Sequence, residues 1–232
     1  MIPLSNVKTR ESCDGIILGS GDDFIIKADE MKLLVATRNE GKIKELAEML
    51  KDLPYDLVSL VDLNIDHEVD ETGSSFEENA ILKAEEYGFL ASMMTIADDS
   101  GIEVDALGGQ PGVFSARYGG DGLDDQDRNK LLLKNVKGVE EELLTARFRC
   151  VVAIYQPFQE TITFDGKVEG YITREQRGSN GFGYDPLFFY PPKGKTLAEI
   201  PSYEKHEVSH RGSAVRKARE YLILQASTQK NI

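Results

Sequence analysis

Two adjacent aspartates interrupt an apolar segment near the middle of the chain. Residues 95–97 predict a short buried strand that ends at Asp98 and Asp99, and a second apolar alternation follows over 102–106. Neighbouring carboxylates at a strand end repel each other unless a cation or a shared proton relieves the repulsion. Mg²⁺ is the usual cation, bound by one or two carboxylates together with substrate phosphates. Asp, Ser and Gly also favour solvated turns, so this segment by itself permits either a cation site or a plain turn.

A strand followed by a helix is predicted over residues 33–50. Residues 33–37 form a short apolar run, and Ile43, Leu46, Ala47 and Leu50 recur at helical spacing. The turn between them ends at Lys42, and the free backbone N–H groups of a helix N-terminus suit a phosphate. The chain contains neither GxxxxGK nor GxGxxG. The turn is therefore either an anion site of another kind or an ordinary connection.

Further elements follow in order. Ser75 and Glu78 have the spacing of a capping box for a helix that ends near Gly88. Asn79 and Lys83, four residues apart, share one face of that helix. Residues 124–135 predict another helix, 146–155 and 161–173 predict an antiparallel pair of long strands, and a last helix follows residue 212.

Two segments near the C-terminus gather glycines, aromatic rings and cations. Residues 178–186 contain three glycines around Phe182 and Tyr184, and a ring there could stack on a nucleobase or simply anchor a flexible loop. Residues 205–212 carry Lys205, His210 and Arg211, which suit either an anionic ligand or a charged helix start.

The net charge of −13 argues against general binding to nucleic acid or to an anionic membrane, both of which need a basic surface. A small anionic substrate remains compatible if cations or a metal are concentrated locally. The chain of 232 residues suits one large domain, and it has no apolar stretch near the ~20 residues that span a bilayer. Cys150 lies in an apolar strand pattern, which predicts a buried thiol and a cytoplasmic protein.

Five segments, taken together and in order, resemble the inosine/xanthosine triphosphate pyrophosphatase family. They are residues 36–42, 71–83 with Glu71, Phe76, Asn79 and Lys83, 97–101, 181–186 and 209–212. The resemblance covers residues 31 to about 224. It implies an α/β fold with a long, curved mixed β-sheet flanked by helices, in two lobes with a central nucleotide cleft. Residues 31–232 are then a nucleotide pyrophosphatase domain, and residues 1–30 are an N-terminal extension of unknown role.

The resemblance also implies an activity: Mg²⁺-dependent hydrolysis of purine NTPs with a 6-keto base (ITP, dITP, XTP) to the monophosphate and pyrophosphate, by a homodimer. It implies Asp99 as the catalytic residue and Glu71, Asp98 and Asp99 as metal ligands. The implied substrate-binding residues are Thr37, Arg38, Asn39, Glu40, Gly41, Lys42, Lys83, Ser100, Phe182, Gly183, Tyr184, Asp185, Lys205, His210 and Arg211. Arg38 stands where the family often has Gly or a small residue.

Two other functions stay open: a pyrophosphatase for other modified or pyrimidine nucleotides, and a nucleotide-binding regulator that does not hydrolyse its ligand. A haloacid-dehalogenase-type phosphatase is disfavoured because residues 98–101 lack the DxDx[TV] spacing.

Overall fold

A computed structural model describes residues 31–120 and 122–229, so the predicted extension over residues 1–30 lies outside the described part of the chain. Seven strands form one mixed sheet in the order β2-β1-β3-β4-β5-β6-β7. Their bounds are β1 Lys32–Val35, β2 Asp56–Ser59, β3 Thr95–Val104, β4 Thr145–Tyr155, β5 Ile162–Ile172, β6 Phe188–Tyr190 and β7 Lys195–Thr196. β1 runs parallel to β2 and β3, whereas β3 through β7 pair antiparallel.

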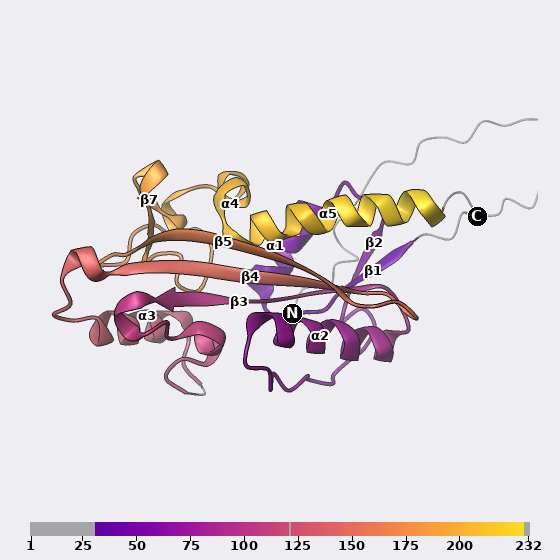
Figure 1. The fold of residues 1–232 in the computed structure, drawn as a ribbon, viewed down its shortest axis with the longest axis horizontal. Helices are drawn as coiled ribbons and strands as arrows, with labels where there is room; N and C mark the ends of the chain where they lie inside the picture. The colour runs from indigo at the N-terminus through magenta and orange to yellow at the C-terminus, as the bar shows by residue number, and fades with distance from the viewer. Residues whose placement is uncertain (1–30, 121, 230–232) are drawn as a thin grey trace, which may run out of the picture.

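Helices cover both faces of this sheet. Their bounds are α1 Glu40–Leu50, α2 Phe76–Ala91, α3 Asp125–Asn135, α4 Ser202–Val208 and α5 His210–Gln229. Figure 1 shows α1, α4 and α5 on one side of the long strands β3 to β5, and α2 and α3 on the other. Consecutive strand residues point to opposite faces, and the cores follow this rule. Ile96 belongs to the apolar cluster under α1 and α5, and its neighbour Ala97 to the cluster under α2.

A third apolar cluster fills the other end of the molecule. It includes Ile102 and Val104 of β3, Leu132 of α3 and Phe188 of β6. The long strands β3, β4 and β5 run continuously between the two ends and curve along their length (Figure 1). The predicted fold class, a mixed sheet flanked by helices, is confirmed.

Three predicted boundaries are wrong. β3 does not end at Asp98 but continues to Val104, because β4 supplies a partner for every residue and pairs Asp99 with Val151; tertiary pairing here overrides the turn preference of the sequence. α2 passes through Gly88 to Ala91. A side chain at Gly88 would clash with the Tyr155 ring, so this glycine permits close packing and does not end the helix. α5 begins at His210, so His210 and Arg211 lie in its first turn, whereas Lys205 belongs to α4.

Among the described residues, no helix has the length and the apolar character that crossing a membrane requires.

Candidate active site

A cleft of about 490 Å³ collects most of the predicted site residues. Of the eighteen distinct site residues that the resemblance implied, fifteen line this cleft. It is lined by Thr37, Arg38, Asn39, Lys42, Glu71, Lys83, Asp99, Ser100, Phe182, Gly183, Tyr184, Asp185, Lys205, His210 and Arg211. Three predicted residues do not line it: Glu40, which is exposed, Gly41, which lies beneath the Phe182 ring, and Asp98.

The turn between β1 and α1 forms one wall. Asn39 caps the helix, because its side-chain oxygen accepts from the backbone N–H of Lys42 at 3.0 Å. The Asn39 backbone N–H in turn donates to the Thr37 hydroxyl at 3.2 Å. The turn therefore presents a hydroxyl, an amide and the positive end of a helix dipole to the cleft, a combination suited to phosphate oxygens.

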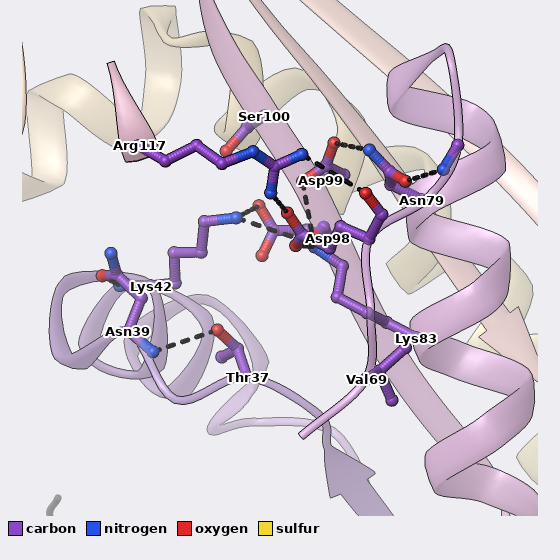
Figure 2. Close-up of polar contacts among 12 residues, drawn as sticks. Thr37, Asn39, Lys42, Val69, Asn79, Lys83, Asp98, Asp99, Ser100 and Arg117 are labelled. Carbon is purple, nitrogen blue, oxygen red and sulfur yellow. Dashed lines mark hydrogen bonds and ion pairs between the residues drawn. The ribbon is translucent and has the colours of Figure 1, made fainter. Parts of the chain in front are cut away.

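The two aspartates of β3 point to opposite faces of the sheet. Asp99 faces α2, where Lys83 Nζ lies 2.9 Å from Oδ1 and Asn79 Nδ2 lies 3.4 Å from Oδ2. Asp98 faces α1 and α5, and its Oδ2 lies 3.1 Å from both Lys42 Nζ and the Arg211 guanidinium. Figure 2 shows Lys42 and Lys83 reaching the pair from different helices. Adjacent carboxylates thus avoid each other because the pleat of the strand separates them.

Glu71 joins Asp99 through a shared cation. Lys83 Nζ lies 2.7 Å from Glu71 Oε1 while it also contacts Asp99. Burial acts to lower the pKa of Lys83, but the charges of Asp99 and Glu71 outweigh it and raise the pKa, so the ammonium is retained. Burial raises the pKa of Asp99, and the negative charge of Glu71 raises it further. The positive charges of Lys83 and Lys42 oppose this rise but do not cancel it. Asp99 is therefore a carboxylate with an increased proton affinity at the floor of the cleft.

Glu71 and Asp99 fit the requirements of Mg²⁺. An ammonium already lies between one oxygen of each, so the position between them favours a cation. Mg²⁺ is usually held by one or two carboxylates together with substrate phosphates and water, which this pair provides. Within the described ranges no group of three or more His, Cys, Asp or Glu side chains could hold a metal by itself. The predicted set of three carboxylates is therefore not assembled: Asp98 lies on the other face of β3, bound to Lys42 and Arg211.

A chain of buried charges runs from Asp98 toward the far end of the cleft. Arg211 bridges Asp98 and Glu45, and Lys205 bridges Glu45 and Asp185. Burial opposes ionisation of Glu45, but Arg211 and Lys205 lower its pKa to about 2. Burial alone would lower the pKa of Lys205, and the two acids raise it instead. Glu45 and Lys205 are thus held charged, and their ion pairs fix their orientation.

Aromatic rings form the opposite end of the cleft. The Phe182 ring lies over the cations of Lys205 and Arg211, 5.0 and 5.4 Å from its centroid, and packs against Gly41. The imidazole of His210 stacks on Phe148 with 4.6 Å between centroids. Burial, followed by the charges of Arg211 and Lys205, holds the pKa of His210 well below its ordinary 6.5, so the ring is neutral at pH 7. Its Nδ1 is buried without a hydrogen-bond partner among the described residues.

Three other predicted residues, Asp185, Tyr184 and Ser100, make hydrogen bonds to neighbouring protein groups. Asp185 accepts from the Phe182 backbone N–H at 2.9 Å and pairs with Lys205, so it orders the aromatic loop. The Tyr184 hydroxyl donates to the Ser115 carbonyl at 2.9 Å. Ser100 accepts from Arg211 at 2.7 Å.

The sequence reasoning missed Glu45 and Arg117. Glu45 lies two residues beyond Ile43 in α1. A charged residue at this position is expected to be exposed to solvent, but the Glu45 side chain is buried. Arg117 lines the cleft and donates to Glu71 Oε2 at 3.1 Å. Nothing in the spacing of either residue could have placed it here, because both contacts join segments more than forty positions apart.

The fold and this cleft define a class: an α/β protein with an open mixed sheet, whose cation-lined cleft accepts a phosphorylated ligand. The chain belongs to the Ham1 family, whose sequence model matches residues 33–221. Because the match covers most of the described chain, the resemblance predicted from the five segments is confirmed.

Individual relatives agree with this assignment. The chain is 52% identical over 186 residues to a dITP/XTP pyrophosphatase of Bacillus licheniformis, covering 80% of this chain and 95% of that protein. It is 50% identical over 189 residues to a dITP/XTP pyrophosphatase of Bacillus subtilis, covering 82% and 96%. Among solved structures, the Staphylococcus aureus Ham1 protein superposes with a TM-score of 0.74 at 39% identity, covering 82% of this chain and 97% of that one. A HAM1 protein from Coxiella burnetii superposes with a TM-score of 0.76 at 36% identity, covering 83% and 98%.

Proposed function

We propose that this chain hydrolyses non-standard purine nucleoside triphosphates, ITP, dITP and XTP, to the monophosphate and pyrophosphate, and so keeps them out of DNA and RNA. The names of its relatives support the substrate class. The observation that carries the proposal is the pairing of Glu71 and Asp99 on one buried ammonium, in a cleft whose other end holds an aromatic ring and a neutral imidazole.

The triphosphate would lie along the wall that α1 begins. Thr37, Asn39 and Lys42 would hold phosphate oxygens there, and Lys83 would contact them from α2. A lysine ammonium binds phosphate as a point charge and stabilises negative charge that develops during phosphoryl transfer. Asp99 would orient the attacking water, and its raised pKa makes it a better proton acceptor than an ordinary aspartate.

Glu71 and Asp99 would hold Mg²⁺. When bound there, the ion polarises phosphoryl oxygens and offsets their charge. Asp98 would have a different role, because its two cations tie α1 and α5 to the strand that carries Asp99.

The purine would occupy the end of the cleft near Phe182, where a ring face can stack on it. O6 of hypoxanthine and xanthine accepts hydrogen bonds, whereas N6 of adenine donates them. Arg211 has four of its hydrogen bonds directed at Asp98, Glu45 and Ser100. The Nδ1 of the neutral His210, which has no hydrogen-bond partner within residues 31–120 and 122–229, is therefore our favoured group for contacting the base edge. Sites built around a specific hydrogen bond can reject a mismatched analogue by about 10⁴-fold.

The family resemblance leads us to propose a homodimer that acts in the cytoplasm. Sedimentation of the purified chain tests the dimer, and fluorescence microscopy of a tagged chain in its host tests the location.

Pyrophosphate release from ITP, XTP, dTTP and ATP in the presence of Mg²⁺ tests the proposed activity. We expect ITP and XTP to be hydrolysed far faster than the other two, and Asp99→Asn to lose at least about 100-fold in rate. Asp165→Asn, an exposed aspartate on β5 outside the cleft, is the matched control. Preferential hydrolysis of dTTP would favour the pyrimidine alternative, and tight ITP binding without turnover would favour the regulator.

A further inference from the structure

The segment that carries Glu71 has no helix or strand of its own. Residues 65–73 run between the turn after β2 and the start of α2. A carboxylate on such a segment is positioned by whatever holds its backbone, since no ladder of hydrogen bonds does so. Two arginines contact this backbone from different parts of the cleft wall.

Arg38 holds the beginning of the segment. Its Nη2 donates to the carbonyl oxygens of Ile65 and His67, each at 2.9 Å. The Tyr87 hydroxyl of α2 donates to the same His67 carbonyl at 3.2 Å. Although Arg38 lines the cleft, these donors point at protein backbone, at positions 27 and 29 residues further along the chain.

Arg117 holds the end of the segment. It closes the short 3-10 helix Gly112–Arg117, and its guanidinium lies 5.2 Å from the centroid of the Phe114 ring. Nη1 donates to Glu71 Oε2 at 3.1 Å, and Nη2 donates to the Glu71 carbonyl oxygen at 3.3 Å. One guanidinium therefore fixes both the carboxylate and the backbone of the same residue.

We propose that Arg38 and Arg117 are positioning residues that strap the Glu71 segment and thereby set its affinity for the divalent cation. This inference rests on the proposed function. A planar guanidinium can bind two oxygens in a fixed geometry, which the single ammonium of lysine does not reproduce. Groups that orient a metal ligand typically change metal affinity about 10- to 100-fold when they are removed. The competing role for these arginines is direct contact with the triphosphate.

Hydrogen exchange of the protein without nucleotide or metal tests directly whether the two arginines order residues 65–73. The backbone N–H groups of Ile65, Val69, Thr72 and Gly73 donate to Leu60, Tyr87, Asp70 and Asn79 respectively, so they report on the order of the segment. We expect exchange at these amides to accelerate at least about tenfold in Arg38→Ala and in Arg117→Ala. The lysine variants, which keep the positive charge but have a single donor nitrogen, should show exchange rates between those of the alanine variants and wild type.

Arg219→Ala is the matched control. Arg219 donates to the Met49 carbonyl and to both carboxylate oxygens of Asp52. It therefore also binds backbone and carboxylate oxygens through its guanidinium, but it lies outside the cleft. Its removal should leave exchange of the Glu71 segment within about twofold of wild type. Circular dichroism identifies any variant that fails to fold, and the lysine variant then stands in for it.

Kinetics supply the second measurement. We expect the Mg²⁺ concentration for half-maximal activity with ITP to rise at least tenfold in both alanine variants, with the ITP KM at saturating Mg²⁺ changed less than threefold. Unchanged exchange at the amides of residues 65–73, or an ITP KM that rises while the Mg²⁺ requirement does not, overturns the proposed positioning role. If wild type releases no pyrophosphate, the proposed function fails, and the exchange measurement still decides whether the arginines order the segment.

Discussion

Glu45→Gln removes one negative charge from the buried chain of ion pairs between Asp98 and Asp185. Glu45 is 7% exposed and contacts the cations of Lys205 and Arg211, each at 2.7 Å. Its pKa of about 2 in the folded protein compares with an ordinary 4.5. At about 1.4 kcal/mol per pKa unit, this difference corresponds to roughly 3 kcal/mol of stability at neutral pH. Breaking a buried pair by removing one partner has a cost of the same size, about 3–5 kcal/mol.

The pH dependence has a definite sign. A carboxyl whose pKa is lower in the folded chain than in the unfolded chain stabilises the fold above the unfolded value, and this contribution is lost as the pH falls through the folded value. For Glu45 the contribution is therefore complete above about pH 5 and declines between 4.5 and about 2. By pH 3 roughly half of it should have been lost.

Urea unfolding of wild type and Glu45→Gln, followed by circular dichroism at several pH values, measures both quantities. Glu48→Gln is the matched control, because Glu48 lies one turn further along α1 and contacts His206 with a partly exposed side chain. We expect Glu48→Gln to change the free energy of unfolding by less than about 1 kcal/mol. A Glu45→Gln effect of that small size at pH 7, or one that does not shrink between pH 5 and 3, would refute the reasoning.

Three other variants probe the base end of the cleft. Phe182→Ala should raise the KM for ITP about 5- to 100-fold through lost stacking, with kcat affected less; an unchanged KM in steady-state assays would place the purine elsewhere. Gly41→Ala puts a Cβ 2.4 Å from the Phe182 ring, so it should raise the same KM, and the double variant should be no worse than Phe182→Ala alone; additive effects would contradict this coupling. His210→Leu should lower the ITP-to-ATP ratio of kcat/KM at least about tenfold, and in wild type this ratio should stay constant from pH 6 to 8 because the imidazole remains neutral; a ratio that titrates near pH 6.5 would show that the ring carries a proton.

The elements of the fold were predictable from the sequence wherever periodicity carried the information. The paired strands β4 and β5 and the cap of α2 at Ser75 appear as predicted. The error at Asp98 arose because a strand that is polar in its middle looks like two strands and a turn. Its continuity depends on β4, which lies more than forty residues away, and local propensity cannot report such a partner.

The site was predictable as a set of residues but not as a set of contacts. Which face of β3 each aspartate occupies follows from alternation only once the strand is known to be continuous. The pairing of Asp98 with Arg211 and the burial of Glu45 depend on α5 packing over α1 and the sheet. Arg38 shows the same limit: the resemblance implied that it binds substrate, but the contacts of its Nη2 with the carbonyl oxygens of Ile65 and His67 could not be predicted from the sequence.

The charges of the cleft themselves argue for a metal. Five of the lysines and arginines that line it are paired with carboxylates: Lys42 with Asp98, Lys83 with Glu71 and Asp99, Arg117 with Glu71, Lys205 with Asp185, and Arg211 with Glu45. Arg38 Nη2 donates to backbone carbonyl oxygens. Such pairing orients the side chains, but it leaves little net positive charge to receive a triphosphate, and the chain as a whole carries −13. A divalent cation that enters with the substrate supplies the missing charge where Glu71 and Asp99 meet. Substrate binding should therefore weaken when the divalent cation is withheld, a difference that equilibrium binding of a non-hydrolysable ITP analogue with and without Mg²⁺ measures.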